Sequence, residues 1–332
     1  MTQQSQIVLA GDIGGTKTRL AVFEVTGTAL NTAAEAVYAS RDYHSFAEIV
    51  RAFKTGHACD CDCACFGVAG PVRQGVCQTT NLPWRLVAAD LADTLGFARL
   101  ALLNDLEATG WGLRALDARD CSELVPGQAD SVGNAAIIAA GTGLGEAGMY
   151  WDGSQHQPFA TEGGHTDFSP GNDLEIELLD YLSKRYAHVS WERVVSGPGL
   201  VNIHAFLRAH HGAATPPWLV ESMQAGDPAA AISEAASTER DEICVRALDL
   251  FVHLYGVEAG NLALKMMTVG GMYIGGGIAP KIIDRLQGNG FMEGFLAKGR
   301  MRPLLEAMPV RVILNDRTAL AGAAIFAASL AR

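Results

Sequence analysis

The sequence has no apolar run long enough to cross a membrane and no cluster of basic residues. Its longest apolar stretch, residues 319–331, is too short for a bilayer and contains a glycine. The 25 Lys and Arg residues are outnumbered by 36 Asp and Glu, for a net charge of −11, which argues against nucleic acid or an anionic membrane as partner. Only residues 1–6 precede the first predicted strand, so we expect no signal peptide.

The spacing of a zinc site is also missing, although four of the seven cysteines alternate with single residues: Cys59, Cys61, Cys63 and Cys65. Zinc-binding pairs have two or more residues between them. Alternation places side chains on one face of a strand. We therefore favour buried thiols on a strand for Cys63 and Cys65, and a loop or strand edge for Cys59 and Cys61. An odd cysteine count in a long chain is typical of free thiols in a reducing compartment.

Two common phosphate-binding fingerprints are absent. The glycines of residues 141–145 have G-x-G spacing, but no helical pattern follows them, which excludes the dinucleotide fingerprint. Lys17 follows Thr16 instead of a glycine, which excludes a Walker A loop. A nucleotide, if one binds, must be held by a turn of another kind.

The sequence does contain a glycine turn between two apolar runs at its start, which is typical of a β-hairpin. The stretch holds a glycine, an acid, two further glycines and two donors: Gly11, Asp12, Gly14, Gly15, Thr16 and Lys17. Glycine backbone N–H groups can surround an anion, and Thr and Lys add donors. Asp12 would repel a polyanion unless a divalent cation or a water lay between them. Taken alone, the stretch fits an ordinary hairpin and a grip on a metal-complexed phosphate about equally well.

A second pattern places polar residues where a strand passes into a helix. Residues 100–103 predict a short buried strand, Asn104 and Asp105 follow it, and residues 106–116 predict a helix. Ligands of open α/β sheets bind at this edge, where a carboxylate can act as a general base. A helix N-cap is the competing interpretation of Asp105, and the local pattern favours it.

The hairpin pattern returns about 130 residues later. An apolar run over residues 134–140 is followed by a turn containing Gly141, Thr142 and Gly143 and by another apolar run. The similarity suggests a duplicated architecture in which each half offers one phosphate-binding turn. A third glycine turn, Gly275, Gly276 and Gly277, ends a later strand and would let a flat ring or a phosphate approach the backbone.

Other polar side chains are suited to neutral hydroxyl groups. Glu162 and His165 flank a Gly-Gly turn, and Glu192 precedes a predicted helix. The alternative for Glu192 is a first-turn acid that stabilises the helix N-terminus, and locally that alternative is favoured. Elsewhere, strands alternate with helices, which predicts an α/β layered fold. We expect helices over residues 45–55, 86–95 and 241–267, and a loop over residues 212–227.

In this order, these motifs resemble the sugar kinase, Hsp70 and actin superfamily of ATPases. Three stretches narrow the resemblance to the bacterial glucokinase family: residues 141–145, residues 162–165 and residues 192–200. The resemblance implies a two-lobed, ribonuclease H-like fold with a cleft. The smaller lobe would contain residues 1–115 and 317–332, and the larger lobe residues 116–316.

The resemblance also implies roles for the motif residues in the transfer of phosphate from ATP to the 6-hydroxyl of D-glucose. Asp105 would be the catalytic base. The sugar hydroxyls would be bound by Asn104, Asp105, Glu162, His165 and Glu192. The nucleotide would be bound by Gly11, Asp12, Gly14, Gly15, Thr16, Gly141, Thr142, Gly143, Gly275, Gly276 and Gly277. Mg²⁺ would accompany ATP, in contact with Asp12 only through water, and the protein would be a cytoplasmic homodimer working in glycolysis.

One departure and one absence qualify the resemblance. Lys17 stands where many family members have Asn, so its role is open. The related repressor and kinase group with a Cys-rich zinc motif after its His is not matched, because no cysteine follows His165 until Cys244. The alternatives are a kinase for fructose or mannose and, with less support, a sugar-binding regulator on the same fold.

Overall fold

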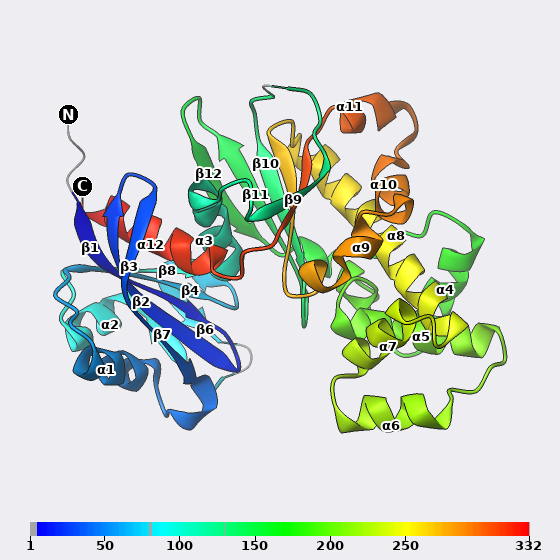
Figure 1. Cartoon of the computed structure of the whole chain (residues 1–332), viewed down its shortest axis with the longest axis horizontal. Coiled ribbons are helices and arrows are strands. Elements are labelled where there is room, and N and C mark those ends of the chain that lie inside the picture. The colour runs from blue at the N-terminus through cyan, green and yellow to red at the C-terminus, as the bar shows by residue number, and fades with distance from the viewer. Residues whose placement is uncertain (1–4, 80–81, 130, 332) are drawn as a thin grey trace. The chain divides into compact units, whose positions relative to one another are not determined.

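The computed structural model describes residues 5–79, 82–129 and 131–331, and it is an α/β structure (Figure 1). The chain divides into two compact units. Unit 1 contains Met1–Asp120, Asp152–Ala160 and Asn315–Arg332, and unit 2 contains Cys121–Trp151 and Thr161–Leu314. Each unit is described by itself.

A five-stranded sheet forms the centre of unit 1. Its strand order is β3-β2-β1-β4-β8. The strands are β1 (Gln6–Ile13), β2 (Lys17–Thr26), β3 (Ala29–Ala39), β4 (Cys63–Val68) and β8 (Arg99–Asn104). The first three are antiparallel neighbours, whereas β4 and β8 run parallel to β1. All six residues of β4 are buried, as expected for a parallel strand covered on both faces.

Helices cover both faces of this sheet. On one face, α1 (Phe46–Gly56) and α2 (Ala88–Leu95) pack on side chains such as Leu9 and Phe66. On the other face, α3 (Asp105–Gly112) and α12 (Thr318–Leu330) pack on Val8, Ala10 and Cys65. A small antiparallel sheet contains β5 (Val72–Arg73), β6 (Val76–Gln78) and β7 (Arg85–Val87).

The two helices on the second face approach each other closely because glycines stand at the contact. A Cβ at Gly112 would lie 1.9 Å from the Thr318 carbonyl oxygen, and one at Gly322 would lie 1.7 Å from that of Ala108. Any side chain at either position would push α3 and α12 apart. The last helix of the chain therefore fixes α3 against the sheet.

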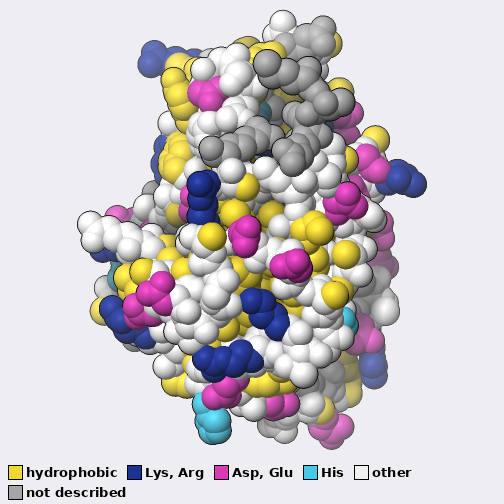
Figure 2. Space-filling model, turned by 90° about the vertical axis from the view of Figure 1, so that its left-hand side faces the viewer, with side chains coloured by type: hydrophobic (Ala, Val, Ile, Leu, Met, Phe, Trp, Pro, Cys, Tyr) yellow, Lys and Arg dark blue, Asp and Glu magenta, His cyan; other side chains and the backbone are white. Residues whose placement is uncertain are grey.

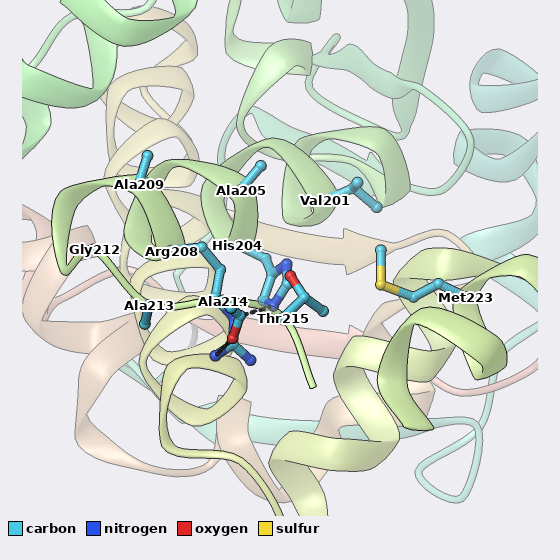
Figure 3. Close-up of a pocket in the computed structure, with 10 residues that line it drawn as sticks. All are labelled: Val201, His204, Ala205, Arg208, Ala209, Gly212, Ala213, Ala214, Thr215 and Met223. Atoms are coloured by element: carbon cyan, nitrogen blue, oxygen red, sulfur yellow. Dashed lines mark hydrogen bonds between the residues drawn. The ribbon is translucent and has the colours of Figure 1, made fainter. Parts of the chain in front are cut away.

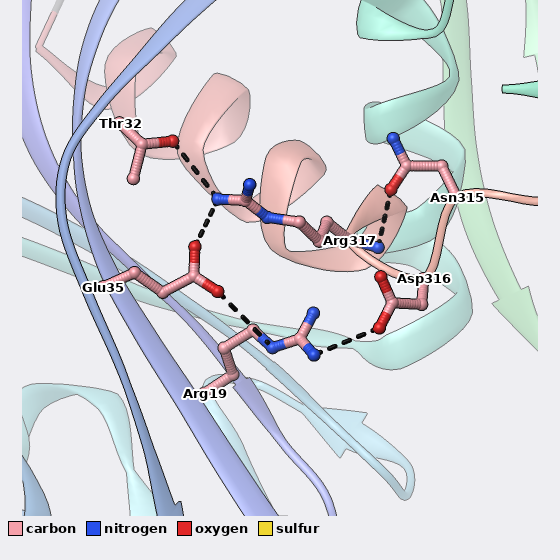
Figure 4. A network of polar contacts seen from close by, with 6 residues as sticks. All are labelled: Arg19, Thr32, Glu35, Asn315, Asp316 and Arg317. Carbon is pink, nitrogen blue, oxygen red and sulfur yellow. Dashed lines mark hydrogen bonds and ion pairs between the residues drawn. The ribbon is translucent and has the colours of Figure 1, made fainter. Parts of the chain in front are cut away.

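A polar network fastens the start of α12 to the first strands (Figure 4). The Glu35 carboxylate lies between the guanidinium groups of Arg19, at 3.7 Å, and Arg317. Arg19 also pairs with Asp316 at 3.1 Å, and Arg317 donates to the Thr32 hydroxyl at 3.2 Å. The network joins the returning C-terminal segment to β2 and β3 within unit 1.

A second sheet, whose strands other than β12 belong to unit 2, has a related order, β12-β11-β10-β13-β14-β9. Its strands are β9 (Cys121–Val125), β10 (Ala135–Ala140), β11 (Leu144–Trp151), β12 (His156–Thr161), β13 (Gly271–Gly275) and β14 (Val310–Ile313). As in unit 1, an antiparallel hairpin (β10 and β11) is followed across the sheet by two parallel strands (β13 and β14). The repeated order confirms the duplication predicted from the two hairpin patterns.

The helices of unit 2 form one large core with this sheet. They are α4 (Asp173–Ser183), α5 (Gly197–His210), α6 (Pro217–Ala225), α7 (Pro228–Ser237), α8 (Glu242–Met266), α9 (Ile283–Leu286), α10 (Asn289–Leu296) and α11 (Arg302–Glu306). The long helix α8 contributes many of the buried side chains, including Phe251 and Tyr255. It contacts α5, α7 and α10 as well as β10.

Several local predictions are confirmed, and two are wrong. Ser45 caps α1 as expected, and β4 begins at Cys63, so Cys59 and Cys61 precede the strand. The loop predicted over residues 212–227 contains α6, which begins at Pro217 and buries Leu219. The helix predicted from residue 86 begins only at Ala88, because the preceding residues pair as β7.

Two surface observations accord with the composition. Within the described residues, no helix is long and apolar enough to cross a membrane. On the face shown in Figure 2, Lys and Arg side chains are interspersed with Asp and Glu.

Candidate active site

Three strand ends of unit 1 meet at one edge of its sheet. Ile13 at the end of β1 is in register with Val68 of β4, and Val68 is in register with Asn104 of β8. The opening turn, the segment after β4 and the start of α3 therefore leave the sheet side by side. In α/β sheets this is the edge at which ligands bind.

The opening turn is held by a serine that the sequence did not single out. The Gly14 N–H donates to the Lys17 carbonyl at 2.9 Å, which closes the turn. Buried Ser40 braces it twice: its N–H donates to the Thr16 carbonyl at 2.9 Å, and its hydroxyl donates to the Gly14 carbonyl at 2.9 Å. Thr16 and Lys17 themselves are exposed. The turn is thus held by Ser40 through its carbonyl groups, while the donor side chains of Thr16 and Lys17 are exposed to solvent.

Asn104, and not Asp105, is the N-cap of α3. The Asn104 side-chain oxygen accepts from the Leu106 and Glu107 N–H groups at 3.0 and 3.4 Å, and its amide nitrogen donates to the Gly70 carbonyl at 3.1 Å. The capping role that the local pattern favoured for Asp105 therefore falls on its neighbour. Asp105 is the first residue of the helix, half-buried, and it accepts one bond from the Leu106 N–H at 3.0 Å.

Burial, together with the nearby Asp12 carboxylate, raises the pKa of Asp105 to about 6. Asp12 is itself affected: burial raises its pKa, and Arg19 opposes that shift. A carboxyl with a pKa near 6 is ionised at neutral pH and is still basic enough to take a proton. Unit 1 therefore presents two carboxylates at its strand edge, and the raised pKa of Asp105 is of the kind that suits a general base.

Gly67 permits this arrangement. It pairs with Asp12 in the sheet. A Cβ at this position would lie 3.1 Å from the Ala108 Cβ and 3.9 Å from the Asp105 Cα. A larger residue would displace the first turn of α3 and Asp105 with it. No local pattern in the sequence indicates this role of Gly67, because its neighbour α3 lies about 40 residues further along the chain.

In unit 2, a buried tyrosine links two of the predicted nucleotide-binding turns. The Tyr255 hydroxyl, from α8, accepts from the Ala140 N–H at 3.1 Å and lies 3.2 Å from the Gly275 carbonyl. Ala140 ends β10 directly before Gly141, and Gly275 ends β13. One side chain thus fixes the ends of both strands.

The two turns themselves differ in their need for glycine. Gly276 has a φ of 82°, and a Cβ there would lie 2.3 Å from the Ala140 carbonyl oxygen, so only glycine fits. At Gly141 and Gly277, by contrast, a Cβ would meet no protein atom within 4 Å. Protein packing does not require glycine at these two positions, whereas the close approach of a ligand to the backbone would.

Glu192 lies against the Gly141–Gly143 turn. Its Oε2 accepts from the Leu144 N–H at 3.0 Å, and a Cβ at Gly143 would lie 2.5 Å from the same oxygen. The Gly197 N–H, at the start of α5, donates to the Gly141 carbonyl at 2.8 Å. Glu192, predicted as a sugar ligand or a first-turn acid, therefore holds the backbone of a predicted phosphate turn with one of its oxygens.

The turn with Glu162 and His165 lies beside the segment that carries Glu192. The Trp191 N–H donates to the Thr166 carbonyl at 3.0 Å, which joins the two segments. Glu162 and His165 are both exposed, so their side chains are accessible to a ligand. The structure thus brings Glu162, His165 and Glu192 together in unit 2, while Asn104 and Asp105 adjoin each other in unit 1.

Beneath this turn, unit 2 buries two carboxyl groups next to each other. Glu146 on β11 and Glu258 on α8 are 2% and 0% exposed. Burial raises the pKa of Glu146 to about 8, and the Glu258 carboxylate contributes to that rise. Asn261 donates to Glu258 at 2.8 Å, and Lys265 lies 3.6 Å from it. A Cβ at residue 163 would lie 1.9 Å from Glu146, so a glycine is required there.

A cavity of about 550 Å³ lies elsewhere on unit 2 (Figure 3). It is formed by the C-terminal half of α5, the following loop and Met223 of α6. The Arg208 guanidinium donates to His204 at 3.1 Å and pairs with Asp241 at 2.6 Å, so the charges beside the cavity are already matched. None of the predicted site residues lines it.

Among the described residues, no group of three or more His, Cys, Asp or Glu could hold a metal ion. The predicted site residues instead form carboxylate and backbone clusters. A metal that accompanies a substrate would need ligands from that substrate and from water.

Comparison with known proteins gives a consistent result. A model of the glucokinase family matches residues 9–330. The glucokinase of Nostoc punctiforme is 42% identical over 339 residues, which cover 98% of this chain and 99% of the relative. The crystal structure of a glucokinase from an Antarctic psychrotroph superposes with a TM-score of 0.86 at 32% identity, covering 98% of this chain and all of that one.

A more distant structure was solved with both kinds of ligand. The ROK family glucokinase of Streptomyces griseus, in complex with glucose and AMPPNP, has a TM-score of 0.65 at 21% identity and covers 97% of this chain and 99% of its own. At that identity the likeness concerns the fold alone.

Proposed function

The chain belongs to the glucokinase family, and we infer that its reaction, the ATP-dependent phosphorylation of D-glucose to glucose 6-phosphate, depends on Asp105 as the base. One observation carries this assignment. A half-buried carboxyl with its pKa raised to about 6 begins a helix at the ligand-binding edge of a sheet. Asp105 accepts the proton of the 6-hydroxyl as the oxygen attacks the γ-phosphorus of ATP.

The sugar is bound by groups that pair with its hydroxyls. A hydroxyl group both donates and accepts hydrogen bonds. Carboxylates accept from it, and an amide or an imidazole can also donate to it. The exposed Glu162 and His165 have side chains available for this, and Glu192 has its second oxygen available. Asn104 already uses its side chain to cap α3, so its contribution is one amide hydrogen and the fixed start of the helix. Such a site rejects sugars that leave these groups unpaired.

The nucleotide is bound by backbone groups of three turns. The Gly14 and Gly141 N–H groups close their own turns, so the donors offered to the phosphates are those of Gly15 and Thr16 in unit 1 and of Thr142 and Gly143 in unit 2. The open space at Gly141 and Gly277 supports close approach of a ligand to the backbone. We assign the phosphates to the first two turns and the adenosine to the turn that contains Gly276.

The residues present fit a magnesium ion that arrives with ATP. Mg²⁺ prefers oxygen ligands, retains several waters and is commonly bound by one or two carboxylates and the substrate phosphates. Asp12, beside the opening turn, is the carboxylate suited to hold it through water. When bound, the ion neutralises charge that develops on the phosphates. Asp12 would then face a cation, which offsets its repulsion of the polyanion.

The remaining assignments concern the whole protein. We propose a ribonuclease H-like kinase of two lobes, with residues 1–115 and 317–332 in the smaller lobe and residues 116–316 in the larger; units 1 and 2 differ from these bounds at residues 116–120, 152–160 and 315–316. Closure of the lobes around the substrates would exclude water, which otherwise competes as the phosphate acceptor. We further propose a homodimer that works in the cytoplasm at the entry of glucose into glycolysis.

The test is ADP release measured across several sugars and phosphoryl donors. We expect release that depends on glucose, with fructose and mannose much poorer acceptors, and ATP with Mg²⁺ the preferred donor. A higher kcat/KM for fructose or mannose than for glucose would overturn the substrate assignment and leave the phosphoryl-transfer assignment in place.

A further inference from the structure

Two cysteines outside the candidate site lie in direct contact. The Sγ atoms of Cys59 and Cys61 are 3.2 Å apart. Neither thiol is part of a disulfide, and both residues are half-buried. A disulfide requires sulfur atoms about 2.0 Å apart, so a movement of about one ångström separates the dithiol from its oxidised form.

The backbone around this pair lies outside the helices and strands. Cys59 and Cys61 lie between the end of α1 and the start of β4, in a segment without helix or strand. The residues between and after them, Asp60 and Asp62, are exposed. Backbone hydrogen bonds hold the two ends of this segment. The His57 N–H donates to the Phe53 carbonyl, and the Arg99 N–H donates to the Asp62 carbonyl.

The remaining cysteines are placed differently. Cys63 and Cys65 are buried in β4, on the face that packs against α12. Cys77 and Cys244 are buried as well. Cys121 is half-buried but lies in unit 2. The pair before β4 thus combines contact between two sulfurs with access from solvent.

We propose that Cys59 and Cys61 form a reversible dithiol–disulfide site that reacts with small-molecule disulfides such as oxidised glutathione. The Cys59 thiolate attacks one sulfur of the reagent and expels a thiolate, which leaves a mixed disulfide. Cys61, after losing its proton to solvent, attacks Cys59 and expels the second thiolate. Two protein thiols are oxidised, and one disulfide reagent is reduced to two thiols.

The contact between the sulfurs also assigns the roles within the pair. The hydrogen bond that Cys61 donates lowers the pKa of Cys59, and Lys54 acts in the same direction. The same bond, together with burial, raises the pKa of Cys61. Cys59 is therefore the thiol that ionises more easily and attacks the reagent, and Cys61 then resolves the mixed disulfide by attacking Cys59.

The experiment incubates the native protein with buffers of oxidised and reduced glutathione, quenches with acid and titrates thiols after denaturation. We expect the titre to fall by two from the seven cysteines of the sequence. Peptide mass spectrometry should find the loss of two thiol hydrogens within the segment that contains Cys59 and Cys61. Dithiothreitol should restore both thiols.

Variants separate this proposal from its competitors. Cys61→Ser should accumulate a glutathione adduct on Cys59, because the resolving thiol is gone, and Cys59→Ser should lose the intramolecular disulfide. The matched control is Cys63→Ala, next in the alternation, which should oxidise like the natural sequence. A trivalent arsenical, phenylarsine oxide, should bind the natural protein and Cys63→Ala at one equivalent, and neither serine variant.

Three results would overturn the proposal: seven thiols retained at every glutathione ratio, a stable glutathione adduct with no internal disulfide in the natural sequence, or a disulfide between Cys61 and Cys63. Because Cys59 and Cys61 are not among the candidate site residues, glucose-dependent ADP release by the reduced serine variants should match that of the natural protein. The oxidation result therefore stands or falls independently of the proposed function.

Discussion

The two units use one strand order for different chemical purposes. Each has an antiparallel hairpin followed by parallel strands, and each ends its hairpin strand in a glycine turn. The edge in unit 1 carries two half-buried carboxylates, Asp12 and Asp105, and the pKa of Asp105 is raised by burial first and by the Asp12 charge second. The edge in unit 2 is mostly neutral backbone, fixed from behind by Tyr255 and Glu192.

This difference indicates a division of labour between the duplicated halves. A general base needs a partly desolvated charge, which unit 1 supplies. Phosphate binding needs oriented N–H groups in a fixed turn, and negative charge beside them is unfavourable. Unit 2 also contains carboxyl groups with raised pKa values. The Glu146 and Glu258 pair, however, is buried beneath the turn, and the raised pKa of Glu146 favours its neutral, protonated form.

The largest expected effect tests whether unit 1 alone supplies the base. Asp105→Asn removes the proton acceptor and keeps the side-chain volume, so kcat should fall about 10²–10⁴-fold, while glucose binding measured by calorimetry persists. Glu107→Gln, a second half-buried acid on α3, is the matched control and should keep most of its activity. Near-normal turnover by Asp105→Asn would remove the contrast between the units.

The next effect concerns the sugar-binding side of unit 2. A hydrogen bond to a charged group is worth about 1.5–3 kcal/mol. Glu162→Gln replaces such a bond with a weaker one between neutral groups. The KM for glucose should therefore rise about 10- to 100-fold, with little change for ATP. Glu221→Gln, an exposed acid on α6, controls for loss of charge in general. Equal changes in both KM values would count against a sugar contact.

Tyr255→Phe tests the support behind the neutral edge. The variant leaves the buried Ala140 N–H without its acceptor, which costs about 1–3 kcal/mol. We expect a lower melting temperature and a KM for ATP that rises more than that for glucose. Tyr273→Phe, on β13 in the same sheet, is the control for loss of a tyrosine hydroxyl. A melting temperature lowered with both KM values unchanged would make Tyr255 a purely structural residue.

Stability should depend on pH through Glu146. Its folded pKa is raised to about 8, so between the ordinary Glu value of about 4.3 and about 8 the native state holds a proton that the unfolded state lacks. Stability is fully present below that window and is lost as pH rises through it, by at most about 1.4 kcal/mol per pH unit.

Glu146→Gln lacks this titration. Its melting temperature should match the natural protein near pH 5 and exceed it increasingly toward pH 8, as measured by scanning calorimetry. The exposed acid Glu293, changed to Gln, should show the same pH dependence as the natural protein. Parallel curves for Glu146→Gln and the natural protein would mean that the buried pair binds no extra proton.

The smallest effect is a shift of the pH profile within unit 1. Below about pH 6, Asp105 is protonated and cannot act as the base, so kcat/KM should fall on the acid side with a midpoint near that value. Asp12→Asn removes the charge that raises this pKa, and the midpoint should move to lower pH by less than about one unit. The control is Asp90→Asn, an exposed residue on α2, which should leave the midpoint unchanged. An unchanged midpoint in Asp12→Asn as well would mean that the Asp12 and Asp105 carboxylates do not interact.

Much of the fold was predictable because its elements follow local rules. The Ser45 cap, the buried run of β4 and the glycine-bounded hairpins are all visible within short stretches. Strands β9 and β12 were missed because they form the edges of their sheet and are only partly buried. Helix α6 was missed because the Gly, Ala and Pro residues directly before it, over residues 212–216, are typical of a loop.

The candidate site was predictable only as far as its residues lie in motifs. Ser40, Gly67 and Tyr255 support the turns and Asp105 from distant parts of the chain, and no local pattern connects them to those turns. The capping role passed from Asp105 to Asn104 because both residue types suit the position and only the backbone course decides between them. Assignment of the sugar and nucleotide contacts stays a prediction.

The glycine contact between α3 and α12 has a consequence for how the protein is made. During synthesis the strands of unit 1 leave the ribosome first, yet α12, which covers one face of β1 and β4, leaves last. Until then the nascent sheet exposes apolar side chains such as Val8 and Ala10. Helix α3, which bears Asp105, also lacks the α12 surface on which it packs in the finished structure. Unit 1 is thus completed only after unit 2 has been synthesised, and its apolar surface is open to non-native contacts in the interval.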